Sequence, residues 1–300
     1  MELRIRNLSK TYANGVVALD KVTLTIPTGM FGLLGPNGAG KSTLMRTLAT
    51  LQECDAGSVF LGDIDVLDEK DAVRRMLGYL PQDFGVYPKV TAYEMLEHFA
   101  VLKGLSHRAR RREVVDGLLQ QTNLWEVRHQ RLGGFSGGMR QRFGIAQALL
   151  GDPKLIIVDE PTAGLDPQER VRFHNLLSDI SEDKTVILST HIVSDVADLC
   201  AQMAIINKGH VLLCGKPQEL IYDIEESIWE RFVTKAELPD FQRRHAVIST
   251  RLLAGRTLIR AYSEQDPGDG FCPAKADLED VYFATIAGRY TAETDCQEAR

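Results

Sequence analysis

The feature that most constrains this 300-residue chain is a glycine-rich segment at residues 35–43, which reads GPNGAGKST. It matches the pattern G-x-x-x-x-G-K-[ST]. A short apolar run at residues 30–34 precedes it, and residues 41–51, with leucines at helical spacing, follow it. A strand, a glycine-rich turn and a helix in this order direct backbone N–H groups toward one point. The segment therefore predicts a phosphate-binding site in an α/β fold.

The side chains of this segment have separate predicted roles. Lys41 supplies a positive charge for the β- and γ-phosphates, Ser42 offers its hydroxyl to Mg²⁺, and Thr43 reaches a phosphate oxygen. The alternative is a glycine-rich turn with a surface lysine, and the flanking strand and helix favour nucleotide binding over it. The expected nucleotide-binding residues of the segment are Gly35, Pro36, Asn37, Gly38, Ala39, Gly40, Lys41, Ser42 and Thr43.

A pair of acidic residues ends the apolar run LIIVDE at residues 155–160. An apolar strand places such a pair at the carboxyl edge of a sheet, where ligands of open α/β sheets bind. We expect Asp159 to hold Mg²⁺ opposite Ser42, and Glu160 to act on the attacking water as a catalytic base. The alternative is a strand-end acidic pair that faces solvent, and the phosphate-binding segment upstream favours the metal site.

Strands and helices are predicted to alternate along much of the chain, as in a parallel sheet covered on both faces. The first thirty residues favour short strands, and short apolar strands follow at residues 155–158, 185–188 and 202–206. Residues 91–151 show helical spacing without a strand, which indicates a helical insertion.

Charge is unevenly distributed. Residues 1–217 carry 25 basic and 25 acidic side chains, whereas residues 218–300 carry 10 and 16, so the chain has a net charge of −6. This shift predicts a boundary near residue 217, between a large domain and a small accessory or regulatory domain at 218–300. The acidic balance argues against a nucleic-acid partner. No apolar run approaches the roughly 20 residues that span a bilayer.

The stretch SGGMRQR at residues 136–142 resembles the signature of ATP-binding cassette (ABC) proteins. The family usually has Leu and Gln where this chain has Phe135 and Met139. The resemblance covers about residues 1–217. It implies a P-loop NTPase cassette of the α/β class, with a parallel-sheet core, an antiparallel β subdomain and a helical insertion at about 91–151. Residues 218–300 would then form a small C-terminal α+β appendage.

The resemblance also implies roles for residues outside the phosphate segment. Tyr12 is similar to the aromatic residue that stacks on adenine, and Gln82 to a glutamine that acts in catalysis and at the metal. Asp166, in the stretch AGLD, is similar to an aspartate that crosses to the partner subunit, and His191 to the catalytic histidine at the γ-phosphate. Taken alone, Tyr12 is more often a packed strand residue, and His191 is more often a capping or core histidine. From the second subunit, the signature residues Ser136, Gly137 and Gly138 would cover the ATP.

The function implied by the resemblance is an ATPase subunit that powers a membrane transporter through ATP-driven head-to-tail dimerisation. The resemblance also implies separate permease subunits and a second cassette, as a homodimer or heterodimer. It places the chain on the cytoplasmic face of the membrane. The stretch LEDVYFATIAG at 278–288 resembles drug and polysaccharide exporters. Two alternatives remain: a soluble cassette ATPase acting on nucleic acid or ribosomes, and a P-loop kinase or GTPase. The stretch NKGH at 207–210 lacks the aspartate with which GTPases read guanine.

Overall fold

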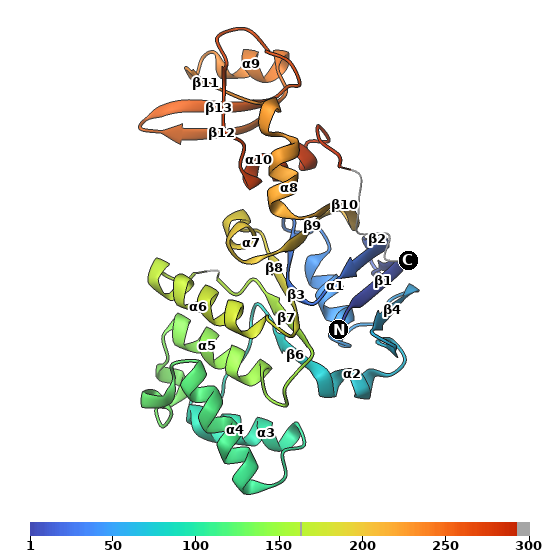
Figure 1. Cartoon of the computed structure of the whole chain (residues 1–300), viewed down its shortest axis with the longest axis vertical. Coiled ribbons are helices and arrows are strands. Elements are labelled where there is room, and N and C mark those ends of the chain that lie inside the picture. Colours follow the sequence, from blue (N-terminus) through green and yellow to red (C-terminus); the bar gives the residue numbers. More distant parts are fainter. Residues whose placement is uncertain (163, 293–300) are drawn as a thin grey trace.

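The computed structural model describes residues 1–162 and 164–292 of the chain. Its centre is a six-stranded sheet with the order β10-β9-β3-β8-β7-β6 (Figure 1). All neighbouring strands in it pair in parallel except β10 and β9, which form an antiparallel hairpin. The strands are β3 (Gly29–Leu34), β6 (Leu77–Leu80), β7 (Leu155–Asp159), β8 (Thr185–Thr190), β9 (Gln202–Asn207) and β10 (His210–Gly215).

A second sheet, antiparallel and in the order β2-β1-β4-β5, lies beside the central sheet. Alternate residues of its strands face one core together with the helix α1 (Lys41–Leu48), and Leu3, Ile5 and Leu24 are fully buried there. The strands are β1 (Leu3–Thr11), β2 (Val17–Ile26), β4 (Ala56–Leu61) and β5 (Ile64–Asp65), and α2 (Lys70–Met76) follows them.

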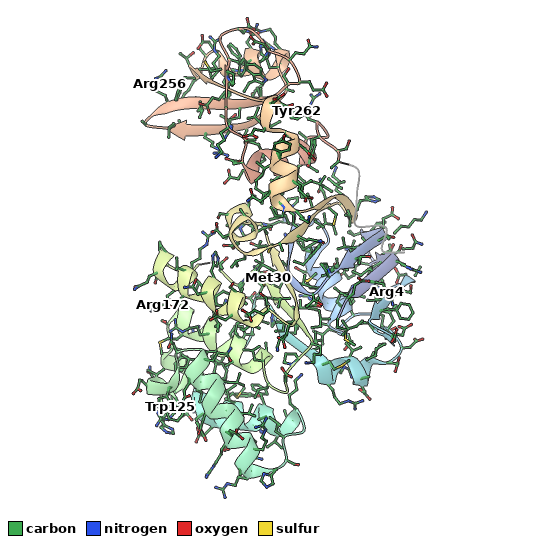
Figure 2. The ribbon with its side chains drawn as sticks, in the orientation of Figure 1. Arg4, Met30, Trp125, Arg172, Arg256 and Tyr262 are labelled. Carbon is green, nitrogen blue, oxygen red and sulfur yellow. The ribbon has the colours of Figure 1, made fainter. Side chains whose placement is uncertain are left out.

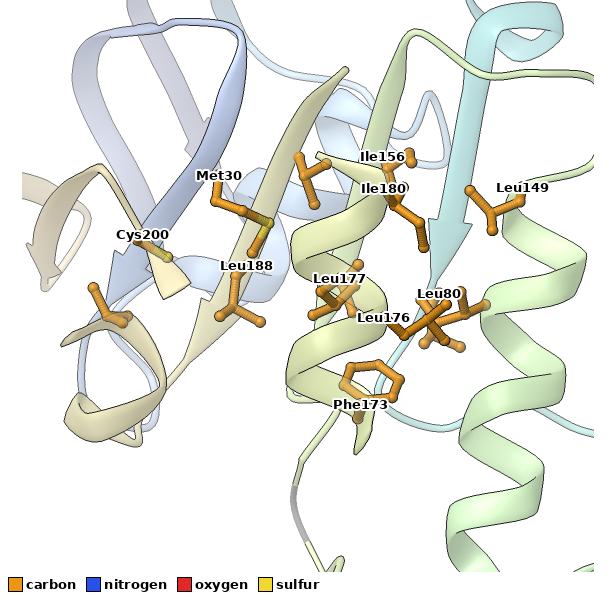
Figure 3. Close-up of a cluster of buried hydrophobic side chains, with 14 of the residues drawn as sticks. Met30, Leu80, Leu149, Ile156, Phe173, Leu176, Leu177, Ile180, Leu188 and Cys200 are labelled. Carbon is orange, nitrogen blue, oxygen red and sulfur yellow. The ribbon is translucent and has the colours of Figure 1, made fainter. Parts of the chain in front are cut away.

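Five helices cover the opposite side and the lower end of the central sheet in Figure 1. They are α3 (Ala92–Leu102), α4 (Arg108–Gln121), α5 (Gly137–Ala148), α6 (Pro167–Ile180) and α7 (Val193–Leu199). Successive residues of β7 point to opposite faces, so Ile156 packs against this helical side while Ile157 joins the core shared with α1. Figure 3 shows Ile156 beside Ile180 of α6.

The last part of the chain forms a separate sheet at the end of the molecule opposite α3 and α4 (Figure 1). This appendage sheet has the order β12-β13-β11-β14, and all its pairs are antiparallel. Its elements are α8 (Pro217–Asp223), β11 (Ile228–Val233), α9 (Leu238–Arg244), β12 (Val247–Leu253), β13 (Arg256–Tyr262), β14 (Cys272–Pro273) and α10 (Leu278–Ile286). Arg256 and Tyr262 mark the two ends of β13 in Figure 2.

The predicted fold class is confirmed: a parallel core, an antiparallel subdomain, a helical segment within 91–151 and an α+β appendage are all present. The expected helix at 41–51 ends at Leu48, and β10, which closes the sheet, runs antiparallel. Near residue 217, where the charge shift predicts a boundary, β10 ends at Gly215 and α8 begins at Pro217. Within the described residues, no helix has the length and apolar character needed to cross a membrane.

A buried ion pair joins the appendage sheet to α10. Arg260 of β13 is 3.1 Å from Asp280, the carboxylate of which is fully buried, and it also contacts Asp277 at 3.3 Å. Burial raises the pKa of Asp280 to about 6, although a backbone hydrogen bond from the Asp277 turn and the charge of Arg260 act against the shift. Since α10 also packs against α7 and α8, this pair fixes the sheet to the helix that joins it to the rest of the molecule.

We expect Arg260→Met to destabilise the appendage by about 3–5 kcal/mol at pH 8.5, because a buried carboxylate loses its counter-charge. Because the pKa of Asp280 is higher in the folded than in the unfolded chain, protonation at lower pH removes the cost of burying its negative charge. The loss of stability should therefore be smaller at pH 6.0 than at pH 8.5. The free energy of unfolding is measured at both pH values by urea unfolding, followed by fluorescence of Trp229 in a Trp125→Phe background. Arg243→Met, at an exposed pair on α9, is the control; equal losses at both pH values would contradict the expectation.

Candidate functional site

The glycine-rich segment forms a tight loop between the end of β3 and the start of α1. Gly38 and Gly40 have φ values of 78° and 109°, in the region that favours glycine. A Cβ on Gly40 would lie 2.5 Å from the carbonyl oxygen of Ala18, so a larger residue would displace the backbone there. In the described part of the chain, no side chain caps the N-terminus of α1, and its first-turn N–H groups stay available for an anion.

Lys41 is buried and lies beneath the loop. Its Nζ donates to the carbonyl oxygens of Gly35 at 2.6 Å and Pro36 at 3.3 Å, and it is 3.6 Å from Oε1 of Glu160. Burial lowers the pKa of the Lys41 ammonium, and the negative charge of Glu160 opposes that shift. The cation is thus positioned between the loop and the acidic end of β7.

Asp159 and Glu160 lie at the carboxyl end of β7, as the sequence predicts. Asp159 is buried, and its Oδ1 has no hydrogen-bond partner in the described part of the chain. Burial raises the pKa of Asp159, against the opposing influence of the Ser189 and Ser42 hydroxyls. A buried carboxylate oxygen without a partner, beside a serine hydroxyl, matches the oxygen ligands that Mg²⁺ requires.

Glu160 adopts an unusual backbone conformation for a residue with a side chain, with φ of 51°. Its N–H donates to the carbonyl oxygen of Ser189 at 2.8 Å. Its carboxylate is buried, and Oε2 lies 2.5 Å from Nδ1 of His191, which directly follows β8. The half-exposed imidazole and the carboxylate therefore face the same cavity.

This cavity, of about 350 Å³, brings together residues that are far apart in the sequence. Tyr12 lies at one side, where its hydroxyl contacts Thr43 Oγ1 at 3.0 Å and donates to Gln52 Oε1 at 3.1 Å. Three lining residues were not predicted from the sequence: Val16, which precedes β2, and Val17 and Ala18, which begin it. The cavity is lined by Tyr12, Val16, Val17, Ala18, residues 36–43, Gln82, Glu160 and His191.

The signature residues and Asp166 do not line this cavity. Ser136 caps α5, accepting from the Met139 N–H at 3.2 Å, and Gly137 and Gly138 form the first turn of that helix. Asp166 caps α6 and accepts from the Glu169 N–H at 2.9 Å. Ala163, the first residue of the AGLD stretch, lies outside the described residues. The structure thus separates the predicted site residues into two groups on different elements.

Residues 207–210, which faintly resemble a guanine-reading motif, form the turn between β9 and β10. Asn207 pairs with His210 across this hairpin. The Gly209 N–H donates to the Ala39 carbonyl at 2.9 Å, so a backbone hydrogen bond joins this turn to the phosphate loop.

Comparison with known proteins identifies the family. The model of the ABC transporter family matches residues 19–163. The Nod factor export ATP-binding protein I of Cupriavidus metallidurans is 38% identical, over 96% of this chain and 97% of that protein. The chain belongs to the ABC transporter ATP-binding proteins. Another relative, the ABC transporter ATP-binding protein YxlF of Bacillus subtilis, is 32% identical over 95% of this chain and 99% of its own length.

Solved structures of ABC cassettes agree with this assignment. A dimeric, post-hydrolysis cassette, MJ0796, bound to ADP and Pi, has a TM-score of 0.65 and 29% identity, covering 71% of this chain and 98% of that one. Subunit cbiO1 of the Clostridium perfringens transporter complex cbiONQ has a TM-score of 0.67 and 27% identity, covering 74% and 90%. The ABC chain described here is accordingly an ATPase of the class that powers transport.

We expect Lys41→Ala to weaken ATP binding by about tenfold to a hundredfold, because charge-assisted hydrogen bonds to phosphate are lost. Titration with a fluorescent ATP analogue at fixed Mg²⁺ measures the Kd. Lys235→Met, at an exposed lysine of the appendage, serves as the control. An unchanged Kd for Lys41→Ala would show that the loop does not bind phosphate as described.

Proposed function

We propose that this chain is the ATP-hydrolysing subunit of a membrane exporter and works as a head-to-tail dimer on the cytoplasmic face of the membrane. The observation that carries the proposal is the division of the predicted residues into two groups. Lys41, Glu160 and His191 share one cavity with the phosphate loop. Ser136 and Asp166 lie outside it, at the N-termini of two other helices. A second subunit is what would bring such helix ends to the phosphates.

In this scheme the cavity of one subunit holds the triphosphate. The loop N–H groups and Lys41 bind its phosphates, and Tyr12, beside the exposed Val16 and Val17, offers an apolar surface for the adenine. Ser42, Gln82 and Asp159 would hold Mg²⁺, which supplies charge neutralisation at the β- and γ-oxygens. Glu160 accepts a proton from the attacking water, and His191, hydrogen-bonded to it, orients its carboxylate toward the γ-phosphate.

The second subunit would close the site with Ser136, Gly137 and Gly138. Ser136 and Gly137 are exposed, and the first turn of α5 contains no acidic residue of its own, so the N-terminus of this helix favours an anion. Because the γ-phosphate then contacts both subunits, ATP stabilises the closed dimer and hydrolysis releases it. The dimeric state of the solved cassette MJ0796 supports this arrangement.

Export as the direction of transport is supported by the names of relatives, which include Nod factor export and, at 33% identity, a linearmycin resistance protein of Bacillus subtilis. We assign residues 1–217 to the ATPase domain and 218–300 to an accessory domain. The break between β10 and α8 and the appendage sheet support that division.

A groove with apolar and basic side chains suits the permease partner. It has a volume of about 610 Å³ and lies between α2, the start of β6 and the ends of α1, α3 and α5. Arg74, Arg75 and Lys103 are its basic lining residues. Leu51 and Leu102, which line it, are 64% and 68% exposed. Apolar side chains exposed at a groove favour burial by a partner. Tyr79 of β6 also lines it, three residues before Gln82, so the groove and the cavity are connected through one short segment.

We expect Glu160→Gln to retain ATP binding and to lower kcat by at least about a hundredfold, because the amide cannot accept the proton. Phosphate release at saturating ATP, with a parallel binding titration, measures both quantities. Glu264→Gln, in an exposed turn of the appendage, is the control. Unaltered turnover in Glu160→Gln would refute the assignment of the base.

We expect Leu102→Glu to abolish co-purification of a polytopic membrane protein from detergent-solubilised membranes, because it puts a carboxylate where the partner would bury a leucine side chain. ATPase activity of the isolated chain should stay unchanged. Leu252→Glu, at a leucine 74% exposed on the appendage, is the matched control. Retained co-purification with Leu102→Glu would exclude the groove as the docking site, and recovery of ribosomes or DNA would favour the soluble alternative.

A further inference from the structure

A fully buried carboxylate, that of Asp195, lies in the first turn of α7 and outside the nucleotide cavity. Its Oδ2 accepts from Thr162 Oγ1 at 2.5 Å. Its Oδ1 accepts from Arg170 Nε at 2.8 Å and lies 2.9 Å from His174 Nε2. Burial by itself would raise the pKa of Asp195, but hydrogen bonds from His174 and Thr162 and the charge of Arg170 hold it below its usual value.

The partners of Asp195 come from the segments that carry the proposed catalytic residues. Thr162 follows Glu160 by two residues, on the loop after β7. Arg170 and His174 belong to α6, the helix that Asp166 caps. Asp195 itself follows His191 by four residues. One buried charge therefore holds together the loop after β7, the helix α6 and the segment after β8.

The helix α6 is also fixed to the signature helix. Glu169, adjacent to Arg170, forms an ion pair with Arg142 of α5. A Cβ on Gly138 would collide with the Glu169 carboxylate, so the two helices are in close contact at the signature. The elements that would serve the partner's nucleotide are thus linked through α6 to Asp195 and to the residues of the chain's own site.

We propose that Asp195 is a positioning residue for ATP hydrolysis, which acts through Thr162 on Glu160 and through α7 on His191. The inference rests on the proposed roles of Glu160 and His191. Glu160 has a positive φ, and a residue in such a conformation keeps it only where its surroundings hold the backbone in place. The bond between Asp195 and Thr162 holds the loop two residues beyond Glu160. Its loss would misplace the base without removing any group that binds ATP.

The test compares Thr162→Val, which keeps the shape but removes the hydroxyl, with Thr162→Ser, which keeps the donor. We expect Thr162→Val and Asp195→Asn to lower kcat about tenfold or more, since small displacements of a catalytic group are costly. The KM for ATP and the Kd of an ATP analogue should change less than about threefold. Thr162→Ser should restore most of kcat. Asp179→Asn, at an exposed aspartate of α6, is the matched control and should retain wild-type kcat.

Because Thr162→Val and Asp195→Asn both act on the Thr162–Asp195 hydrogen bond, the double variant should lose little more kcat than the worse single variant. A structural role alone predicts lower melting temperatures with unchanged kcat per folded molecule, and that result would overturn the proposal. Glu160→Gln is measured in parallel. If it loses turnover while Thr162→Val does not, the positioning role is wrong and the proposed function stands. If Glu160→Gln keeps its turnover, the proposed base and the positioning role both fail.

Discussion

Parallel pairing of β3, β7 and β8 in register is the constraint on which the site depends. Leu34 of β3 lies opposite Thr190 of β8, and Asp159 of β7 lies opposite Ser189. The residues that follow these strand ends are therefore neighbours, although β3 is more than a hundred positions from β7 and β8 in the chain. The phosphate loop, the acidic pair and His191 meet at one edge because three strands end at the same level.

Electrostatics then determines how these neighbours are arranged. Lys41 is buried, so its charge must be balanced by loop carbonyls and by Glu160. Glu160 in turn contacts His191, and one oxygen of Asp159, beside Ser42, has no hydrogen-bond partner among the residues that the structure describes. A triphosphate with Mg²⁺ would satisfy these groups together. Its phosphates would give negative charge to Lys41 and to the loop N–H groups, and the metal ion would bind the Asp159 carboxylate. The geometry of the cavity thus agrees with the function proposed from the family.

The buried polar contacts of α6 extend this arrangement beyond the cavity. Asp195 connects the loop after Glu160 to α6, and Glu169 connects α6 to the signature helix. The appendage is attached by a different kind of contact, through α10 and the Arg260–Asp280 pair. Buried charges therefore fix relative positions of elements in both parts of the molecule, where apolar packing alone would allow more than one register.

The sequence by itself determined the local features. Three short-range patterns predicted the fold class, the phosphate loop and the acidic pair after β7: the glycines of residues 35–43, apolar strands that end in acids, and helical spacing in 91–151. They did not predict β11 or α9, whose mixed polar residues carry weak periodicity and which fold around the small core of Phe241, Ile259 and Phe271. Only the tertiary structure decided that Val16 and Val17 face the cavity, and that Thr162 and Asp195 share a hydrogen bond. Such contacts depend on the register of distant strands and on which groups are buried together, and no local pattern of residues encodes them.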